Sequence, residues 1–254
     1  MSDMSIIEIH NLTKTFDGIK AVDSVTIEFT EAKITGLVGP NGAGKTTILN
    51  LINGFLKPDE GEIYFKDKKI DGKPPWEITN LGIGRLFQDV RVFRKLTVLE
   101  NVLMARINNP GEQPLKLIFS SSKVKQLEKE NKEEARHWID FVGLGGREDS
   151  AAESLSFGQQ KLLAIARLLA GKHSVLLLDE PTAGVNPIMV KPLLDLIRKI
   201  VEADRTVIFI EHNMNVVLEI ADWLYFLNEG KVTSFGLPSD VLGDPEVRRT
   251  YLGI

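Results

Sequence analysis

The chain has 254 residues, of which 43% are hydrophobic, so it can bury a sizeable core in one large domain or two small ones. Its 31 basic and 35 acidic residues give a formal net charge of −4, without the basic excess that nucleic-acid binders usually carry. Cysteine is absent, which excludes disulfides and thiolate metal sites, and we expect no secretory leader or membrane span because no apolar run is long enough.

The first part of the chain is predicted to form strands joined by tight turns. Alternating apolar residues indicate strands over residues 6–12, 22–29 and 62–70. Asp17-Gly18 is a turn signal between the first two strands. We expect these strands to form an antiparallel layer at one edge of the fold.

A glycine-rich loop lies between a predicted buried strand, residues 34–38, and a predicted helix that ends near residue 53. The loop fits the pattern G-x-x-x-x-G-K-[ST] and reads Gly39-Pro40-Asn41-Gly42-Ala43-Gly44-Lys45-Thr46-Thr47. Its glycines let successive N–H groups face one point, and the helix N-terminus adds a partial positive charge, so the loop can hold phosphate. We expect Lys45 to reach the β- and γ-phosphates and the Thr46 hydroxyl to hold Mg²⁺.

The rest of the chain alternates between predicted strands and helices. Strands are predicted over residues 83–87, 175–178, 206–210, 222–227 and 231–235. Helices are predicted from residue 97, over 123–142 and 158–171, after the candidate N-cap Asn186 and in the tail 238–252. Residues 108–122 are predicted to be irregular. This order favours a doubly wound α/β sheet interrupted by an all-helical subdomain.

Two carboxylates follow the fully apolar strand 175–178. The strand would lift Asp179 to the carboxyl end of the sheet, beside the glycine loop, where it can hold Mg²⁺ directly or through water. Glu180 would point elsewhere and is placed to accept a proton from an attacking water. The alternative is a strand that merely ends in acidic residues, which the presence of the glycine loop disfavours.

A third motif, Leu155-Ser156-Phe157-Gly158-Gln159-Gln160, directly precedes a predicted helix. Ser156 and the backbone amides at that helix start would form a second anion site. With the glycine loop and Asp179-Glu180, this motif makes the chain closely resemble the ATP-binding cassette (ABC) ATPases over essentially its whole length. The resemblance implies a P-loop, RecA-like α/β fold: a doubly wound, mainly parallel sheet with an antiparallel β layer and an inserted α-helical subdomain. We expect residues 1–90 and 158–254 to form the nucleotide-binding core and residues 91–157 the helical signature subdomain.

The resemblance also implies roles for single residues. Phe16 looks like the aromatic that stacks on adenine, Gln88 like the glutamine that touches Mg²⁺ and the attacking water, and His212 like the histidine that contacts the γ-phosphate. The alternatives are a core aromatic for Phe16 and a structural histidine for His212. The implied catalytic residues are Glu180, His212 and Gln88, and the implied Mg²⁺ ligands are Thr46, Gln88 and Asp179. The implied ATP-binding residues are Phe16, Gly39, Pro40, Asn41, Gly42, Ala43, Gly44, Lys45, Thr46 and Thr47, with Ser156, Phe157, Gly158 and Gln159.

Two residues depart from the usual family pattern. Phe157 stands where glycine is usual, and an aromatic there is similar to the cassettes of branched-chain amino-acid importers. Asn186 stands where aspartate is frequent, in the loop 183–186 that crosses the dimer in the family. Residues 87–93, 96–102, 108–119 and the ending Tyr251-Leu252-Gly253 also look like the importer branch.

The implied function is ATP hydrolysis, with ATP and Mg²⁺ as cofactors, by a transporter subunit that powers translocation through separate membrane subunits. We expect import of branched-chain amino acids or a related small polar solute; an exporter ATPase and a soluble non-transport ABC ATPase are the alternatives. The expected partners are a second cassette, identical or related, permease subunits and, indirectly, a solute-binding protein, but no nucleic acid. The expected location is cytoplasmic, peripheral on the inner face of the cell membrane.

Overall fold

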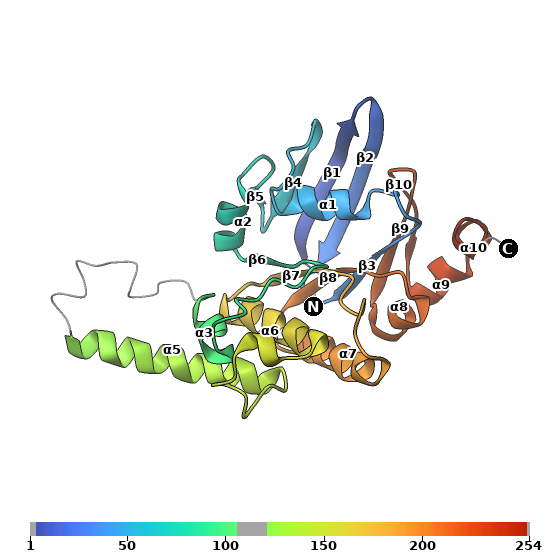
Figure 1. Ribbon diagram of the computed structural model, residues 1–254. Coiled ribbons are helices and arrows are strands. Elements are labelled where there is room, and N and C mark those ends of the chain that lie inside the picture. The colour runs from blue at the N-terminus through green and yellow to red at the C-terminus, as the bar shows by residue number, and fades with distance from the viewer. Residues whose placement is uncertain (1–3, 106–120, 253–254) are drawn as a thin grey trace. The chain divides into compact units, whose positions relative to one another are not determined.

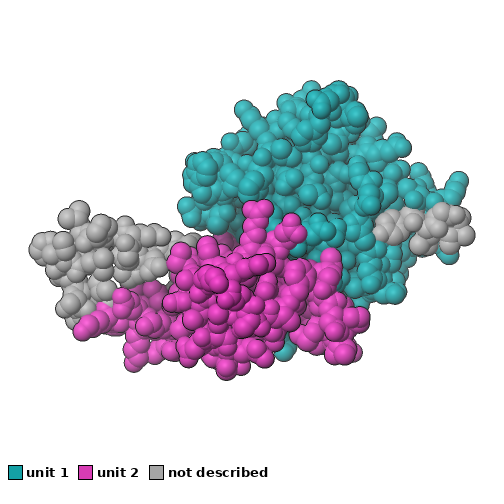
Figure 2. Space-filling model, viewed as in Figure 1, with its two compact units in different colours: residues 1–88, 174–182, 194–254 teal, residues 89–173, 183–193 magenta. Residues whose placement is uncertain are grey.

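The computed structural model describes residues 4–105 and 121–252, so the predicted insertion 108–119 and Gly253 lie outside the described residues. The chain forms two compact units (Figure 2). Unit 1 comprises residues 1–88, 174–182 and 194–254, and unit 2 comprises residues 89–173 and 183–193. The unit boundaries differ from the expected domain boundaries, since residues 158–173 group with the helical segment. The two expected domains themselves stay a prediction.

Unit 1 contains the predicted antiparallel layer (Figure 1). It is a four-stranded sheet of order β2-β1-β4-β5, with β1 Ser5–Phe16, β2 Ile19–Thr30, β4 Glu60–Phe65 and β5 Lys68–Lys69. Asp17 and Gly18 join β1 to β2 with φ values of 47° and 82°, as a two-residue type I′ hairpin turn requires. The predicted strand 62–70 is divided into β4 and β5 because Lys66 and Asp67 both have positive φ.

The second sheet of unit 1 is the predicted, mainly parallel one. Its strand order is β10-β9-β3-β8-β7-β6, and only β10 runs antiparallel to its neighbour. The strands are β3 Ile34–Val38, β6 Ile83–Leu86, β7 Val175–Asp179, β8 Thr206–Ile210, β9 Trp223–Asn228 and β10 Lys231–Gly236. Every residue of β3, β7 and β8 is buried, as is typical of parallel strands covered on both faces. The carboxyl ends of the parallel strands therefore meet at one edge of the sheet.

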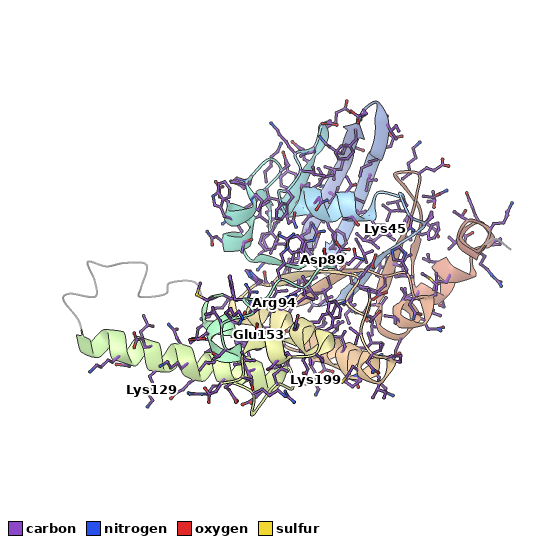
Figure 3. The ribbon with its side chains drawn as sticks, viewed as in Figure 1. Lys45, Asp89, Arg94, Lys129, Glu153 and Lys199 are labelled. Carbon is purple, nitrogen blue, oxygen red and sulfur yellow. The ribbon has the colours of Figure 1, made fainter. Side chains whose placement is uncertain are left out.

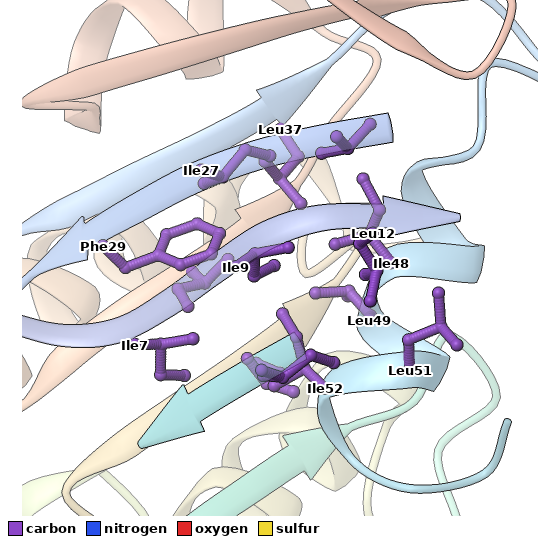
Figure 4. Close-up of a cluster of buried hydrophobic side chains, with 14 of the residues drawn as sticks. Ile7, Ile9, Leu12, Ile27, Phe29, Leu37, Ile48, Leu49, Leu51 and Ile52 are labelled. Atoms are coloured by element: carbon purple, nitrogen blue, oxygen red, sulfur yellow. The ribbon is translucent and has the colours of Figure 1, made fainter. Parts of the chain in front are cut away.

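A hydrophobic core joins the antiparallel sheet to helix α1, Lys45–Ile52 (Figure 4). Ten of its side chains are 0–1% exposed: Ile7, Ile9, Leu12, Ile27, Phe29, Leu37, Ile48, Leu49, Leu51 and Ile52. Each such side chain contributes roughly 1.5–3 kcal/mol of hydrophobic stabilisation when fully buried. The core thereby anchors the helix that directly follows the glycine loop.

One hydroxyl links the two sheets of unit 1. The Tyr225 hydroxyl, on β9, donates to the carbonyl oxygen of Glu28 on β2 at 2.8 Å and accepts from the Glu28 N–H at 3.3 Å. Burial raises the pKa of Tyr225, so this hydroxyl keeps its proton. Beside it, a groove of about 1090 Å³ runs between β2 and the β9–β10 hairpin, and no predicted site residue lines it.

Two helices of unit 1 are absent from the sequence prediction: α2, Pro75–Leu81, and α8, Met214–Ile220. The predicted helical tail forms α9, Pro238–Gly243, and α10, Pro245–Leu252. Helix α7, Pro187–Glu202, begins where expected, because the Asn186 side-chain oxygen accepts the Ile188 N–H at 3.0 Å. None of the helices in the described ranges combines the length and apolar composition needed to cross a membrane.

Unit 2 is helical, as predicted for this part of the chain. It contains α3 Val98–Leu103, α5 Ser121–Phe141, a short 3₁₀ turn Ala152–Ser154 and α6 Phe157–Ala170. Ala135 and Ile139 bury one face of α5, whereas Lys129 and Glu133 pair at 3.8 Å on its solvated side (Figure 3). Helices α3 and α6 both begin with a capping box.

Candidate functional site

The glycine loop leads from the buried strand β3 into α1. Gly44 is the N-cap of α1 and has φ 98°, and a Cβ atom there would lie 2.3 Å from the carbonyl oxygen of Ala21. Only glycine fits this position. No side chain caps the first turn of α1, and that turn holds no acidic residue. Its N–H groups therefore suit phosphate oxygens, which would supply the missing acceptors.

The Lys45 side chain folds back onto the glycine loop; Figure 3 labels the residue. Its ammonium donates to the carbonyl oxygens of Gly39 at 2.7 Å and Pro40 at 2.8 Å, and the residue is 5% exposed. Burial lowers the pKa of Lys45, and the charges of Glu180 and Asp179 oppose that shift. A phosphate at this loop would supply the negative charge that favours the buried ammonium.

Asp179, the last residue of β7, carries a buried ion pair. Its carboxylate accepts from a guanidinium N–H of Arg85 at 2.7 Å, and the two side chains are 8% and 5% exposed. Arg85 also donates to the Asn50 side chain on α1 at 2.6 Å. Sequence reasoning missed Arg85, although a lone cation in the apolar strand Ile83–Leu86 was a usable signal.

Glu180 joins two other predicted residues in a polar cluster. Its carboxylate accepts from Gln88 Nε2 at 2.9 Å and lies 3.0 Å from His212 Nε2. The backbone of Glu180 is left-handed, with φ 48°, which is uncommon for a residue other than glycine. The bend directs its carboxylate to this cluster while the carboxylate of Asp179 meets Arg85. The two neighbouring acids thus have different partners, as expected.

Glu211 is a second residue that sequence reasoning missed. It is 4% exposed, and one carboxylate oxygen accepts from the N–H of Thr182 at 2.9 Å and from its hydroxyl at 2.5 Å. The other oxygen accepts from the His212 N–H at 3.2 Å. Glu211 therefore ties the segment that follows Glu180 to the start of the His212 loop. An acid between a buried strand and the predicted histidine was the available signal.

Phe16 and Thr46 are two further predicted residues of unit 1. Phe16 ends β1 and is 42% exposed, and Asp59 fixes that strand end by accepting from the N–H of Thr15 and the ammonium of Lys14, both at 2.7 Å. An exposed ring of this kind suits stacking on a flat base. Thr46 is exposed on the first turn of α1. Their assigned roles stay predictions.

Ser156, Phe157, Gly158 and Gln159 belong to unit 2, where they start α6. The Ser156 hydroxyl accepts from the Gln159 N–H at 3.4 Å, and the Gln159 side chain accepts from the Ser156 N–H at 3.0 Å. These two hydrogen bonds form a capping box, so Ser156 and Gln159 also stabilise the start of α6. Their predicted contact with ATP is not tested by it.

The described residues hold no group of three or more His, Cys, Asp or Glu side chains that could bind a metal ion. Mg²⁺ is commonly held by one or two carboxylates together with substrate phosphates and waters rather than by a full protein cage. The donor set of Thr46, Gln88 and Asp179 fits that mode of binding.

Comparison with known proteins agrees with this geometry. Residues 22–183 match the ABC transporter family. An Archaeoglobus fulgidus protein named "Probable branched-chain amino acid transport ATP-binding protein LivG" is 39% identical over 252 residues, which cover 98% of this chain and 96% of that protein. The high-affinity branched-chain amino acid transport ATP-binding protein BraF of Pseudomonas aeruginosa is 37% identical, with 98% of both chains covered.

Two solved structures have the same fold. The ADP conformation of an ATP-binding cassette of an ABC transporter is 37% identical, with a TM-score of 0.86 over 99% of this chain and 100% of that one. A dimeric cassette in a post-hydrolysis state with ADP and phosphate is 28% identical, with a TM-score of 0.73 over 91% of this chain and 98% of that one. The glycine loop, the two consecutive acids Asp179 and Glu180 and these full-length similarities lead to one conclusion: the chain belongs to the ABC transporter family and is one of its ATP-hydrolysing cassettes.

Proposed function

We propose that Glu180, Gln88 and His212 are the catalytic residues for ATP hydrolysis. The observation that carries this assignment is the Glu180 carboxylate held between Gln88 at 2.9 Å and His212 at 3.0 Å. The water oxygen attacks the γ-phosphorus, the bond from that phosphorus to the β–γ bridging oxygen breaks, and Glu180 accepts the proton of the water. Gln88 orients the water, and His212 contacts the γ-phosphate.

Mg²⁺ would be held by Thr46, Gln88 and Asp179 together with phosphate oxygens. When bound, it would neutralise charge that develops on the phosphates. Asp179 would contribute carboxylate charge to that site, directly or through water, while its Oδ2 accepts from Arg85.

ATP would bind with its base on Phe16 and its phosphates on residues 39–47. We propose that Ser156, Phe157, Gly158 and Gln159 of a second cassette complete the site, through the N–H groups that start α6. The dimeric relative with ADP and phosphate supports this arrangement. Two chains related by a two-fold axis would then enclose two ATP molecules.

The two relatives support a role in the import of branched-chain amino acids or a related small polar solute. Permease subunits would carry the solute, and this chain would lie peripherally on the cytoplasmic face of the membrane. Residues 90–100, which follow Gln88, would dock on the permease; Phe93 there is 47% exposed and the Lys95 side chain 86%. Copurification with permease subunits followed by ATP-driven uptake of leucine into vesicles tests this role, and ATP-driven efflux alone would contradict it.

Glu180→Gln tests the two-chain site, because it keeps the shape of the side chain but removes the proton acceptor. We expect the variant to be monomeric without nucleotide and dimeric with ATP in size exclusion with light scattering. Glu229→Gln is the matched control, since Glu229 is exposed in the β9–β10 turn and also has a left-handed backbone, with φ 47°. A Glu180→Gln protein that binds ATP yet stays monomeric, alone and beside its permease, would overturn the proposal.

A further inference from the structure

Phe157, the residue that departs from the usual family pattern, packs on the loop 183–186. Phe157 is 45% exposed and takes the first position of α6. A Cβ atom added to Gly184 would lie 2.9 Å from Cε1 of that ring, closer than real Cβ contacts come. The ring therefore occupies space that any other residue at position 184 would need.

Lys161 holds the same loop from the next turn of α6. It is 1% exposed, and its ammonium donates to the carbonyl oxygen of Ala183 at 2.7 Å. The ammonium also lies 5.4 Å from the centroid of the Phe157 ring, in the range of a cation–π contact. Burying a charged ammonium costs free energy unless it is hydrogen-bonded or paired. The bond to the Ala183 carbonyl oxygen therefore offsets part of that cost.

Gly158 leaves room for a Cβ atom beside the same loop. A Cβ atom at Gly158 would stand 3.7 Å from a methyl group of Val185, which is ordinary van der Waals distance. The first turns of α6 thus hold the carbonyl oxygen of Ala183 through Lys161 and, through the Phe157 ring, leave no room for a side chain at Gly184. Residues 183–193 also group with residues 89–173 in unit 2, although the chain enters them from unit 1.

We propose that Phe157 and Lys161 are positioning residues that clamp the loop 183–186 to the start of α6. This inference rests on the proposed function, in which the start of α6 faces the ATP of a second chain. The clamp joins the start of α6 to the loop 183–186, which follows Glu180 and Thr182 in the chain. The two elements are then presented to a partner as one piece rather than as two independent loops.

The first test uses the nucleotide-free Glu180→Gln chain and needs no dimer. Gly184→Ala introduces both a left-handed alanine and the clash with Phe157, whereas Gly146→Ala introduces the left-handed alanine alone, because Gly146 has φ 79° and open space at its Cβ. Combined with Phe157→Gly, the Gly184→Ala shift in melting temperature should be smaller than additive by about 2 °C or more. The Gly146→Ala shift in melting temperature should add to the Phe157→Gly shift without any such deviation. Additive shifts in both pairs would overturn the clamp.

The second test measures the ATP-dependent dimer in the same background. Gly184→Ala should weaken the dimer about tenfold or more, Gly146→Ala less than about threefold, and neither should change ATP affinity of the single chain more than about twofold. Lys161→Met should weaken the dimer about as much as Gly184→Ala does. Lys161→Arg keeps a hydrogen-bond donor and should therefore keep the affinity of the dimer.

The outcomes separate the two proposals. If the parent dimerises and Gly184→Ala dimerises as tightly as Gly146→Ala, the positioning role is wrong. If the Glu180→Gln parent never dimerises, the two-chain site is wrong, and the melting-temperature cycle alone decides whether the clamp exists.

Discussion

The polar residues of the candidate site in unit 1 are held by contacts between distant segments, whereas those at the start of α6 in unit 2 are held by their own helix turn. Arg85 and Asp179 are 94 residues apart in sequence, and Gln88 and Glu180 are 92 apart. Ser156 and Gln159 are three apart. The first arrangement exists only when the parallel sheet is assembled, and the second is a local motif that other helices also form. Substitutions should therefore act through tertiary structure and chemistry in unit 1 but mainly through association in unit 2.

The largest effect is expected from Lys45→Ala. It should abolish ATP hydrolysis and strongly weaken nucleotide binding, because a phosphate in the loop would lose its nearest point charge. Turnover and nucleotide titration check this, with Lys199→Ala, an exposed lysine on α7, as the control (Figure 3). Near-normal turnover of the Lys45 variant would refute the assignment of the phosphate loop.

His212→Ala comes next. We expect a loss of about 10²–10³-fold in turnover, because His212 would stabilise charge on the γ-phosphate in the transition state, with little change in ADP affinity. Single-turnover kinetics and ADP titration separate the two quantities. An equal loss of ADP binding would instead give His212 a structural role.

Arg85→Met probes the long-range pair in unit 1 directly. It leaves the buried carboxylate of Asp179 without its cation, which should cost about 3–5 kcal/mol of unfolding free energy in the nucleotide-free chain. Denaturant titration measures this cost. Lys73→Met is the comparison, because Lys73 and Glu77 form an exposed pair at 3.3 Å that should contribute less than about 1 kcal/mol. Similar losses for both variants would mean that the buried pair is not important for stability.

Ser156→Ala should have the smallest effect on the stability of the single chain. It tests whether the start of α6 in unit 2 acts mainly through association, in contrast to the long-range contacts of unit 1. Losing the capping hydroxyl should cost about 1 kcal/mol of stability. Thr97→Ala is a matched control, because Thr97 caps α3 in the same unit by the same bonds, at 3.1 Å and 2.7 Å. Both variants should lose similar stability, but only Ser156→Ala should also lose ATP-driven dimerisation in the Glu180→Gln background. Loss of the dimer in both would show that capping, not ATP contact, is the cause.

The sequence predicts best what is local. Strand 34–38 and strand 206–210 match the structure to the residue, because short, mostly apolar segments between turn signals identify buried strands. Helix α2 was missed because Pro74-Pro75 resembles a loop, yet Pro75 takes the first helical position, where its missing N–H costs nothing. Helix α8 was missed because one or two turns give little periodicity.

What the sequence could not predict depends on pairing between distant segments. The position of β3 between β9 and β8 is set by contacts that no local pattern encodes. Arg85 and Glu211 carry a sequence signal, as charged residues in or beside apolar strands, but only the folded sheet brings Asp179 and Thr182 to them as partners. The glycine loop, Asp179-Glu180 and the motif at residues 155–160 are identifiable from the sequence, because their residue types and spacing indicate phosphate or metal binding before any fold is known.

The Tyr225 hydroxyl has a consequence for self-association. Strand β2 is twelve residues long and stands at the edge of its sheet, where unpaired backbone groups can template pairing with another molecule. Tyr225 occupies both backbone groups of Glu28, near the end of that strand, with a single side-chain oxygen. The phenol thus occupies two backbone groups of that edge that could otherwise pair with another strand, and Tyr225→Phe would free them while keeping the ring.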